Sequence, residues 1–151
     1  MRERTVLLFA SSVVVIIGAC TAPPPSKSRF LAGFSATDVI KRSYDQGGAQ
    51  KEPTVSGGES SSVLGSRRIH HRDDSADLLI SKNDEPLFLS TIKREIEGQL
   101  QKSGCRMVGG GFGDNNFHIE YTDGSVNGWI DLLGMRGAGD SYRLIIIITE
   151  S

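Results

Sequence analysis

The clearest periodic pattern in the chain lies between residues 83 and 104. Asn83-Asp84-Glu85-Pro86 is typical of a helix start, because Asn or Asp can cap free backbone N–H groups and proline is tolerated in the first turn. Apolar residues then recur at intervals of three and four, and Gly104 follows as a stop signal. The pattern predicts an amphipathic helix with an apolar stripe of Leu89, Ile92, Ile96 and Leu100.

Strict alternation of apolar and polar residues replaces this pattern in residues 117–122 and 125–133. The two segments flank Asp123-Gly124, a strong hairpin signal, and folding about this pair places His118 opposite Trp129. Both strands then sort into the same two faces, which a slip of one residue would scramble. The face expected to pack on the helix is Phe117, Ile119, Tyr121, Val126, Gly128, Ile130 and Leu132. The other face is His118, Glu120, Thr122, Ser125, Asn127, Trp129 and Asp131.

Two further strands are predicted around this hairpin. One covers residues 105–108 and leads into the glycine-rich segment 109–113, which fits a bulge or a wide turn better than a phosphate-binding loop. The other covers residues 142–149 and is apolar on both sides, which is typical of a strand covered on both faces. Trp129, Ile145 and Ile147 should lie together on the second face. Either the segment around Phe30 to Phe34 covers them, or they form an exposed binding patch.

The N-terminal half carries fewer signals. Three prolines at residues 23–25 favour an extended spacer, and residues 43–62, rich in Gly, Ser, Gln and charge, are predicted to be disordered. His70 and His71 stand in a charged stretch, but adjacent histidines of a strand point to opposite faces, so we expect no metal there. These patterns predict an α+β fold, with one amphipathic helix packed on an antiparallel meander of three to four strands.

The first 20 residues combine a basic start at Arg2 and Arg4 with an apolar run, residues 6–17, that is shorter than the roughly 20 residues of a membrane-spanning helix. Ile17-Gly18-Ala19-Cys20 follows, an aliphatic residue and two small residues before a cysteine. This segment resembles the signal peptide and lipobox of bacterial lipoproteins. The alternative is an ordinary signal peptide or an uncleaved anchor with an incidental cysteine.

The resemblance implies export, cleavage before Cys20 and attachment of acyl chains such as palmitate to that cysteine, so that the membrane itself becomes a partner of the chain. It implies a location in the cell envelope. Thr21 follows the cysteine, whereas aspartate there often means retention in the inner membrane, so the outer membrane facing the periplasm is expected. The expected organisation is a signal peptide (residues 1–19), a lipid-anchored and largely disordered tether (20–62) and an α+β domain (63–151, core 83–151).

Charge and cysteine content narrow the function classes. The 17 basic and 18 acidic side chains nearly cancel, which gives no reason to expect nucleic acid as a partner. If Cys20 carries lipid, Cys105 has no partner within the chain. We expect Cys105 to be a small buried apolar residue, and an intermolecular disulfide or a reactive thiol are the alternatives.

Two functional hypotheses remain. The first is a non-catalytic binding or structural module that contacts an envelope protein or a cell-wall component. Its expected surface is Trp129, His118, Glu120, Ile145 and Ile147. The second is a small periplasmic enzyme or ligand-binding domain that uses His118, Glu120 and Asp131 and therefore requires a concave pocket over them. No catalytic residue, metal ligand or cofactor site can be assigned from the sequence.

Overall fold

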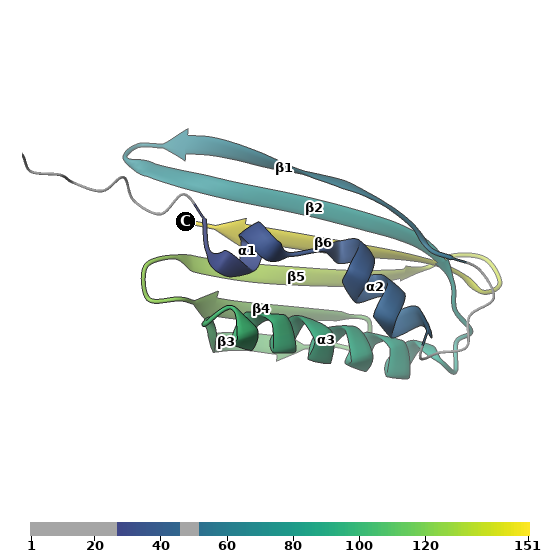
Figure 1. The fold of residues 1–151 in the computed structure, drawn as a ribbon. Coiled ribbons are helices and arrows are strands. Elements are labelled where there is room, and N and C mark those ends of the chain that lie inside the picture. The colour runs from purple at the N-terminus through teal and green to yellow at the C-terminus, as the bar shows by residue number, and fades with distance from the viewer. Residues whose placement is uncertain (1–26, 46–51) are drawn as a thin grey trace, which may run out of the picture.

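A computed structural model describes residues 27–45 and 52–151. Three helices and six strands follow in the order α1 (Arg29–Gly33), α2 (Ala36–Asp45), β1 (Thr54–Leu64), β2 (Arg67–Leu79), α3 (Glu85–Lys102), β3 (Arg106–Phe112), β4 (Asn116–Thr122), β5 (Asn127–Arg136) and β6 (Ser141–Glu150). The strands form one open antiparallel sheet in the order β1-β2-β6-β5-β4-β3. All three helices lie on the same face of this sheet (Figure 1).

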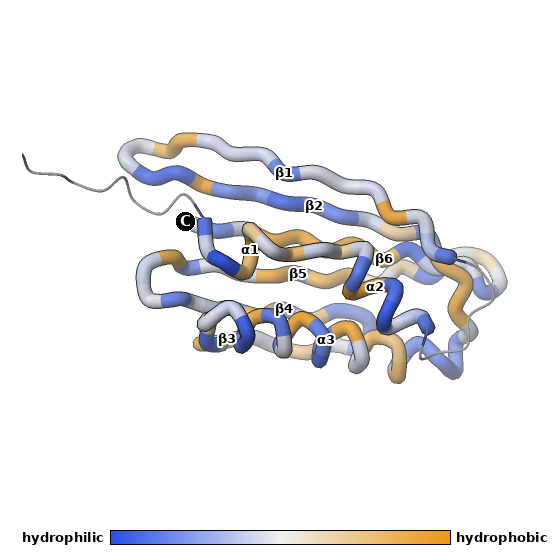
Figure 2. Tube along the Cα trace, viewed as in Figure 1, coloured by the Kyte–Doolittle hydropathy of each residue, from blue (hydrophilic) through white to orange (hydrophobic). Residues whose placement is uncertain are grey.

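The α+β class is confirmed, but the predicted strand count of three to four is too low. The additional strands are β1 and β2, which form a long hairpin with eleven paired positions from Thr54↔Asp77 to Leu64↔Arg67. β2 then pairs with β6, so the hairpin extends the predicted meander at one edge. Most strongly apolar positions lie in β5, β6 and α3, whereas β1 and β2 are mostly polar (Figure 2). Backbone pairing, which needs no apolar alternation, therefore accounts for these two strands.

The structure also differs from the prediction of disorder over residues 43–62. The end of α2 and most of β1 lie in this range, while residues 46–51 lie outside the described part of the chain. A Ser- and Gly-rich strand at a sheet edge can be as polar as a linker, because solvent replaces the core on much of its surface.

Helix α3 matches its sequence pattern closely. The predicted stripe is buried, and Gly104 adopts φ +79° just beyond the helix end. There the N–H of Gly104 donates to the carbonyl of Gln101 at 3.1 Å, and the N–H of Cys105 donates to that of Leu100 at 2.9 Å. This pair of bonds is a Schellman cap, which requires the left-handed backbone that glycine adopts without strain.

The β4–β5 hairpin keeps the predicted faces but not the predicted register. Thr122 pairs with Asn127, so the loop has four residues, and every pair is displaced by two positions from the expected one. The cause is the Asp123 carboxylate, which accepts hydrogen bonds from the backbone N–H groups of Ser125 (2.9 Å) and Val126 (2.8 Å). A shift of two residues leaves each side chain on its face, whereas a shift of one would not.

The hydrophobic core lies between the helices and the sheet. Phe30 of α1 is buried there, with its ring centroid 5.2 Å from that of Tyr121 and 5.4 Å from that of Phe34. Residues 30–34 therefore pack on the helix side of the sheet, and the expectation that they cover Trp129, Ile145 and Ile147 is wrong.

Within residues 27–45 and 52–151, no helix is both long and apolar enough to span a membrane.

The glycine-rich segment continues strand β3 instead of ending it. A bulge between Met107 and Gly109 shifts the register with β4, as the sequence suggested, but the chain turns only after Phe112. Gly110 has φ +148°, and a Cβ there would lie 2.3 Å from the backbone oxygen of His118. A side chain is excluded at this position because the two strands approach closely.

Candidate functional site

The sheet face opposite the helices has no helix or loop packed on it in the described part of the chain. We call it the open face. It comprises the side chains of β4, β5 and β6 that point away from the helices, namely His118, Glu120, Trp129, Asp131, Leu133, Met135, Ile145 and Ile147.

Cross-strand pairing brings the apolar members of the open face together. Leu133 lies opposite Ile145, and Asp131 lies between His118 on β4 and Ile147 on β6. Trp129 is 37% exposed, and Leu133 and Met135 are also exposed, while the two isoleucines are partly buried. The residues that the sequence grouped by alternation thus share one surface. The predicted pairing of His118 with Trp129 is wrong, because Trp129 lies opposite Glu120.

His118 is held by two carboxylates at the margin of this surface. Its Nδ1 lies 2.6 Å from Oδ1 of Asp131, and its Nε2 lies 3.5 Å from Oε1 of Glu120. The hydrogen bond to Asp131 raises the pKa of His118, with a smaller contribution from Glu120. In the protonated ring both N–H groups point at carboxylates, so the imidazole has no lone pair directed at a substrate. This arrangement suits a charged, fixed side chain better than a general base.

An open depression of about 330 Å³ lies beside His118. Its lining is Val108, His118, Glu120, Tyr121, Asn127, Gly128 and Trp129. The lining contains no serine, threonine or cysteine that could act as a nucleophile, and Asp131 is not part of it. The depression can therefore hold a small group, but its residues do not form a hydrolytic arrangement.

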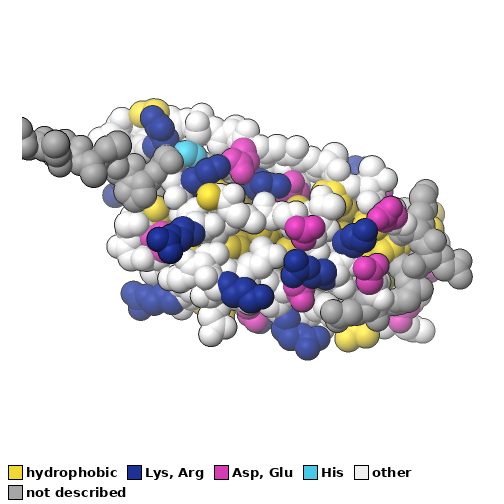
Figure 3. Space-filling model, viewed as in Figure 1, with side chains coloured by type: hydrophobic (Ala, Val, Ile, Leu, Met, Phe, Trp, Pro, Cys, Tyr) yellow, Lys and Arg dark blue, Asp and Glu magenta, His cyan; other side chains and the backbone are white. Residues whose placement is uncertain are grey.

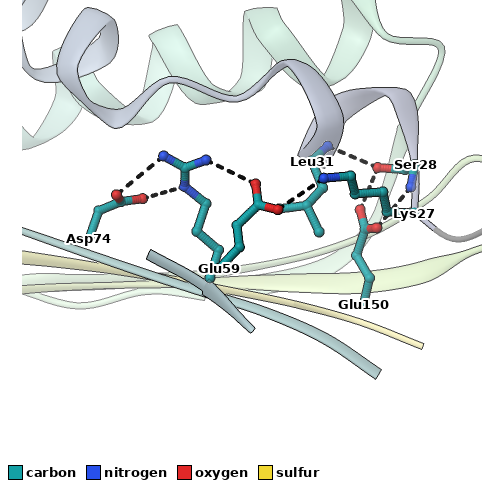
Figure 4. Close-up of polar contacts among 7 residues, drawn as sticks. Lys27, Ser28, Leu31, Glu59, Asp74 and Glu150 are labelled. Carbon is teal, nitrogen blue, oxygen red and sulfur yellow. Dashed lines mark hydrogen bonds and ion pairs between the residues drawn. The ribbon is translucent and has the colours of Figure 1, made fainter. Parts of the chain in front are cut away.

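A second cluster, which the sequence analysis did not predict, is buried on the helix side of the sheet. Glu150 of β6 is fully buried, and its carboxylate accepts hydrogen bonds from the backbone N–H of Ser28 (2.8 Å) and from the Ser28 hydroxyl (Figure 4). It also accepts a hydrogen bond from the Tyr121 hydroxyl (2.7 Å). Ser28 Oγ in turn accepts from the N–H of Leu31 at 3.1 Å and so caps helix α1. We call the contact between Ser28, Tyr121 and Glu150 the Glu150 clasp.

Cys105 is buried near the Glu150 clasp, as expected for a small apolar residue. Burial raises the pKa of its thiol, and the nearby charges of Asp123 and Glu150 act in the same direction. Burial also raises the pKa of Tyr121, so this hydroxyl stays a hydrogen-bond donor to Glu150. A polar residue at the end of an apolar strand was the only sequence signal for this cluster, and it is a weak one.

The charged stretch around His70 and His71 lies in β2, where Arg72 forms ion pairs. Nε of Arg72 lies 2.6 Å from Asp74, its Nη1 lies 3.1 Å from Glu59, and Glu59 lies 2.9 Å from Nζ of Lys27 (Figure 4). This chain of contacts joins Lys27, which precedes the N-cap of α1, to both strands of the β1–β2 hairpin. Among the described residues, no group of three or more His, Cys, Asp or Glu side chains is placed to hold a metal ion.

Comparison with known proteins identifies no relative of this chain. The chain matches no family model, no curated protein and no solved structure at a significant level.

Proposed function

We propose that this chain is a lipid-anchored envelope protein whose open face binds a protein partner without catalysing a reaction. The anchor is Cys20 at the start of the mature chain, and the location is the outer membrane facing the periplasm. The observation that supports the binding role best is the open face itself, an apolar centre that no described segment covers.

The composition of the open face favours a protein partner. It carries aliphatic side chains together with a methionine and a tryptophan, and the last two residue types are enriched in protein interfaces. Nε of Arg143 lies 2.8 Å from Asp77 at one side of this face, and Asp131, which holds His118, lies between Trp129 and Leu133 on β5. A cell-wall glycan would require polar groups directed at its hydroxyls, which Leu133, Ile145 and Ile147 do not offer.

The anchor can be tested by metabolic labelling with a clickable fatty acid. The wild-type chain and the Cys105→Ser variant should incorporate the label, and the Cys20→Ser variant should not. Cys105→Ser is the matched control because it removes the other cysteine of the chain. Unchanged labelling of Cys20→Ser would refute lipid attachment at this residue.

The open face can be tested by photo-crosslinking in the native envelope. A photoreactive residue at Leu133, which is exposed on the open face, should give one discrete crosslinked protein. The same residue at Leu87, which is exposed at the start of α3, should not. Trp129→Ala should reduce the Leu133 product while the thermal midpoint stays unchanged. The proposal fails if both positions give the same background, or if Trp129→Ala unfolds the chain and so proves that Trp129 belongs to the core.

The depression beside His118 favours a second candidate, the binding of a small ligand. Its volume suits a single small group, and Glu120 and Asn127 could supply polar contacts. The two candidates differ in their response to Glu120→Gln. A small polar ligand should lose affinity, whereas the crosslinked protein product from Leu133 should persist, since Leu133 lies outside the depression.

A further inference from the structure

Five segments of the chain converge at one end of the molecule (Figure 1). Ser28 is fixed there by the Glu150 clasp, the β1–β2 turn and the β4–β5 loop lie beside it, and α3 ends where β3 begins. The fifth segment is the end of β6, where Glu150 pairs with Gly128 and Ser151 is hydrogen-bonded to Asn127. We call this the anchor end, and it comprises residues 27–29, 63–68, 102–106, 123–127 and 150–151.

The anchor end is also the part of the fold closest along the chain to Cys20. Eight residue steps separate Cys20 from Ser28, so even a fully extended chain places their Cα atoms at most about 28 Å apart. Strand β2 alone has 13 residues and is therefore about 43 Å long. Since the connection is shorter than the sheet, a chain held at Cys20 must turn the anchor end, and not the opposite end, toward the point of attachment.

Charge at the anchor end is strongly one-sided. Six basic side chains lie within it, namely Lys27, Arg29, Arg67, Arg68, Lys102 and Arg106, against two acidic side chains, Asp123 and the fully buried Glu150. All of these basic residues except Lys27 are exposed and have no ion-pair partner in the described part of the chain. Figure 3 shows basic side chains at this end of the molecule, although the whole chain is close to neutral.

The tip of the β1–β2 hairpin adds an apolar element to this basic surface. Val63 is 69% exposed and Leu64 is 71% exposed, the two highest values among the large hydrophobic residues described. Val63 pairs with Arg68 and Leu64 pairs with Arg67, so each apolar side chain lies beside an arginine on the same face of the hairpin. Apolar side chains that enter the headgroup region, with basic side chains beside the lipid phosphates, are the two components of interfacial membrane binding.

We propose that the anchor end is a lipid-binding surface, in which Val63 and Leu64 enter the interface of an anionic bilayer and the basic side chains contact its phosphates. The proposal rests on membrane attachment near Cys20 as proposed above. Attachment at Cys20 limits how far the anchor end can lie from the bilayer, and the lipid-binding surface would hold this end in contact with it. The strands then stand away from the membrane, and the open face points sideways, where a partner can reach it.

Depth-dependent quenching of tryptophan fluorescence tests this orientation. Trp129 is the only tryptophan of the chain, so Trp129→Phe gives a background without one. Leu64→Trp then places a reporter at the anchor end, and Leu79→Trp places the matched control at the other end of the hairpin, where Leu79 is also exposed. Each full-length chain is reconstituted into phosphatidylethanolamine–phosphatidylglycerol vesicles that contain brominated lipids.

The expected result is the loss of most emission from Leu64→Trp and little loss from Leu79→Trp. Equal quenching of both reporters, or quenching of neither, would overturn the proposal. Arg67→Gln with Arg68→Gln, and equally the omission of phosphatidylglycerol, should reduce the quenching of Leu64→Trp. Arg143→Gln, at the far end of β6, should not reduce it. If the arginine variants and the neutral vesicles behave like the reference, the basic side chains have no part in binding.

The readout separates this proposal from that of lipid attachment. The mass of the reconstituted chain reports acylation independently of fluorescence. An acylated chain whose Leu64→Trp emission is not quenched would overturn the lipid-binding surface and leave the anchor intact. A chain without acyl groups, held on the vesicle by its apolar residues 6–17, could still show quenching of Leu64→Trp. That result would refute lipid attachment and support the lipid-binding surface. A chain that does not float with the vesicles refutes both proposals.

Discussion

Replacing Glu150 by glutamine should destabilise the fold more than any other change of one polar atom in the described core. The carboxylate is fully buried and accepts three hydrogen bonds, two of them from Ser28 and one from Tyr121. A hydrogen bond to a charged group contributes about 1.5–3 kcal/mol, and a buried donor left without an acceptor costs about 1–3 kcal/mol. Glutamine keeps one acceptor oxygen but places an NH₂ group against a donor, so we expect a loss of about 3 kcal/mol.

The magnitude predicts a clear signal in thermal unfolding. For a domain of this size, about 3 kcal/mol corresponds to a decrease of roughly 10–15 °C in the midpoint. Circular dichroism on the wild type, Glu150→Gln, Ser28→Ala and Tyr121→Phe would measure it. Each of the last two removes one hydroxyl and should cost less than Glu150→Gln. A midpoint for Glu150→Gln within 2 °C of the wild type would refute the assigned role of the clasp.

Three further predictions address other sites. Gly128→Ala should cost about 1–3 kcal/mol in chemical denaturation, because its Cβ would lie 2.5 Å from Cζ of Tyr121, and a cost near zero would contradict the tight packing. The Cys105 thiol should resist a thiol reagent until denaturant is added, since burial raises its pKa, and rapid reaction in the folded chain would disprove this. Asp131→Asn should lower the pKa of His118 measured by NMR. Because the wild-type pKa is raised, the pair stabilises the fold at low pH and loses that contribution as pH rises through the folded-state pKa. An unchanged pKa in the variant would exclude the pairing.

The sequence predicted those parts of the fold in which apolar residues occupy the buried positions and polar residues the exposed ones. Helix α3 and strands β4 and β5 each place apolar residues on one contiguous core surface, so their period is visible without a structure. Strand β6 was recognised instead from its continuous run of apolar residues. The register of the β4–β5 hairpin was wrong because the Asp123 side chain sets the loop length, and a count of turn residues does not detect that hydrogen bonding.

The parts that were missed depend on contacts between distant residues. β1 is held by backbone pairing with β2, and its serines and glycines carry no period. Helix α2 is the exception. It was missed although its buried residues Ala36, Val39, Ile40 and Tyr44 have helical spacing in the sequence. The open-face residues could be grouped by alternation alone. That Phe30 packs on Tyr121, and so leaves the open face uncovered, depends on a contact across 91 positions that no local pattern encodes.

The Glu150 clasp also determines how an anchored chain would carry mechanical load. A pull on Cys20 enters the fold at Ser28 and passes through its hydrogen bonds to Glu150. Glu150 belongs to β6, which is paired with β2 on one side and β5 on the other. Force applied along a strand that has neighbours on both sides must shear many hydrogen bonds together, whereas force on an edge strand opens them one at a time. If the chain is anchored as proposed, the clasp would transfer tension at Ser28 to the part of the sheet that resists it best.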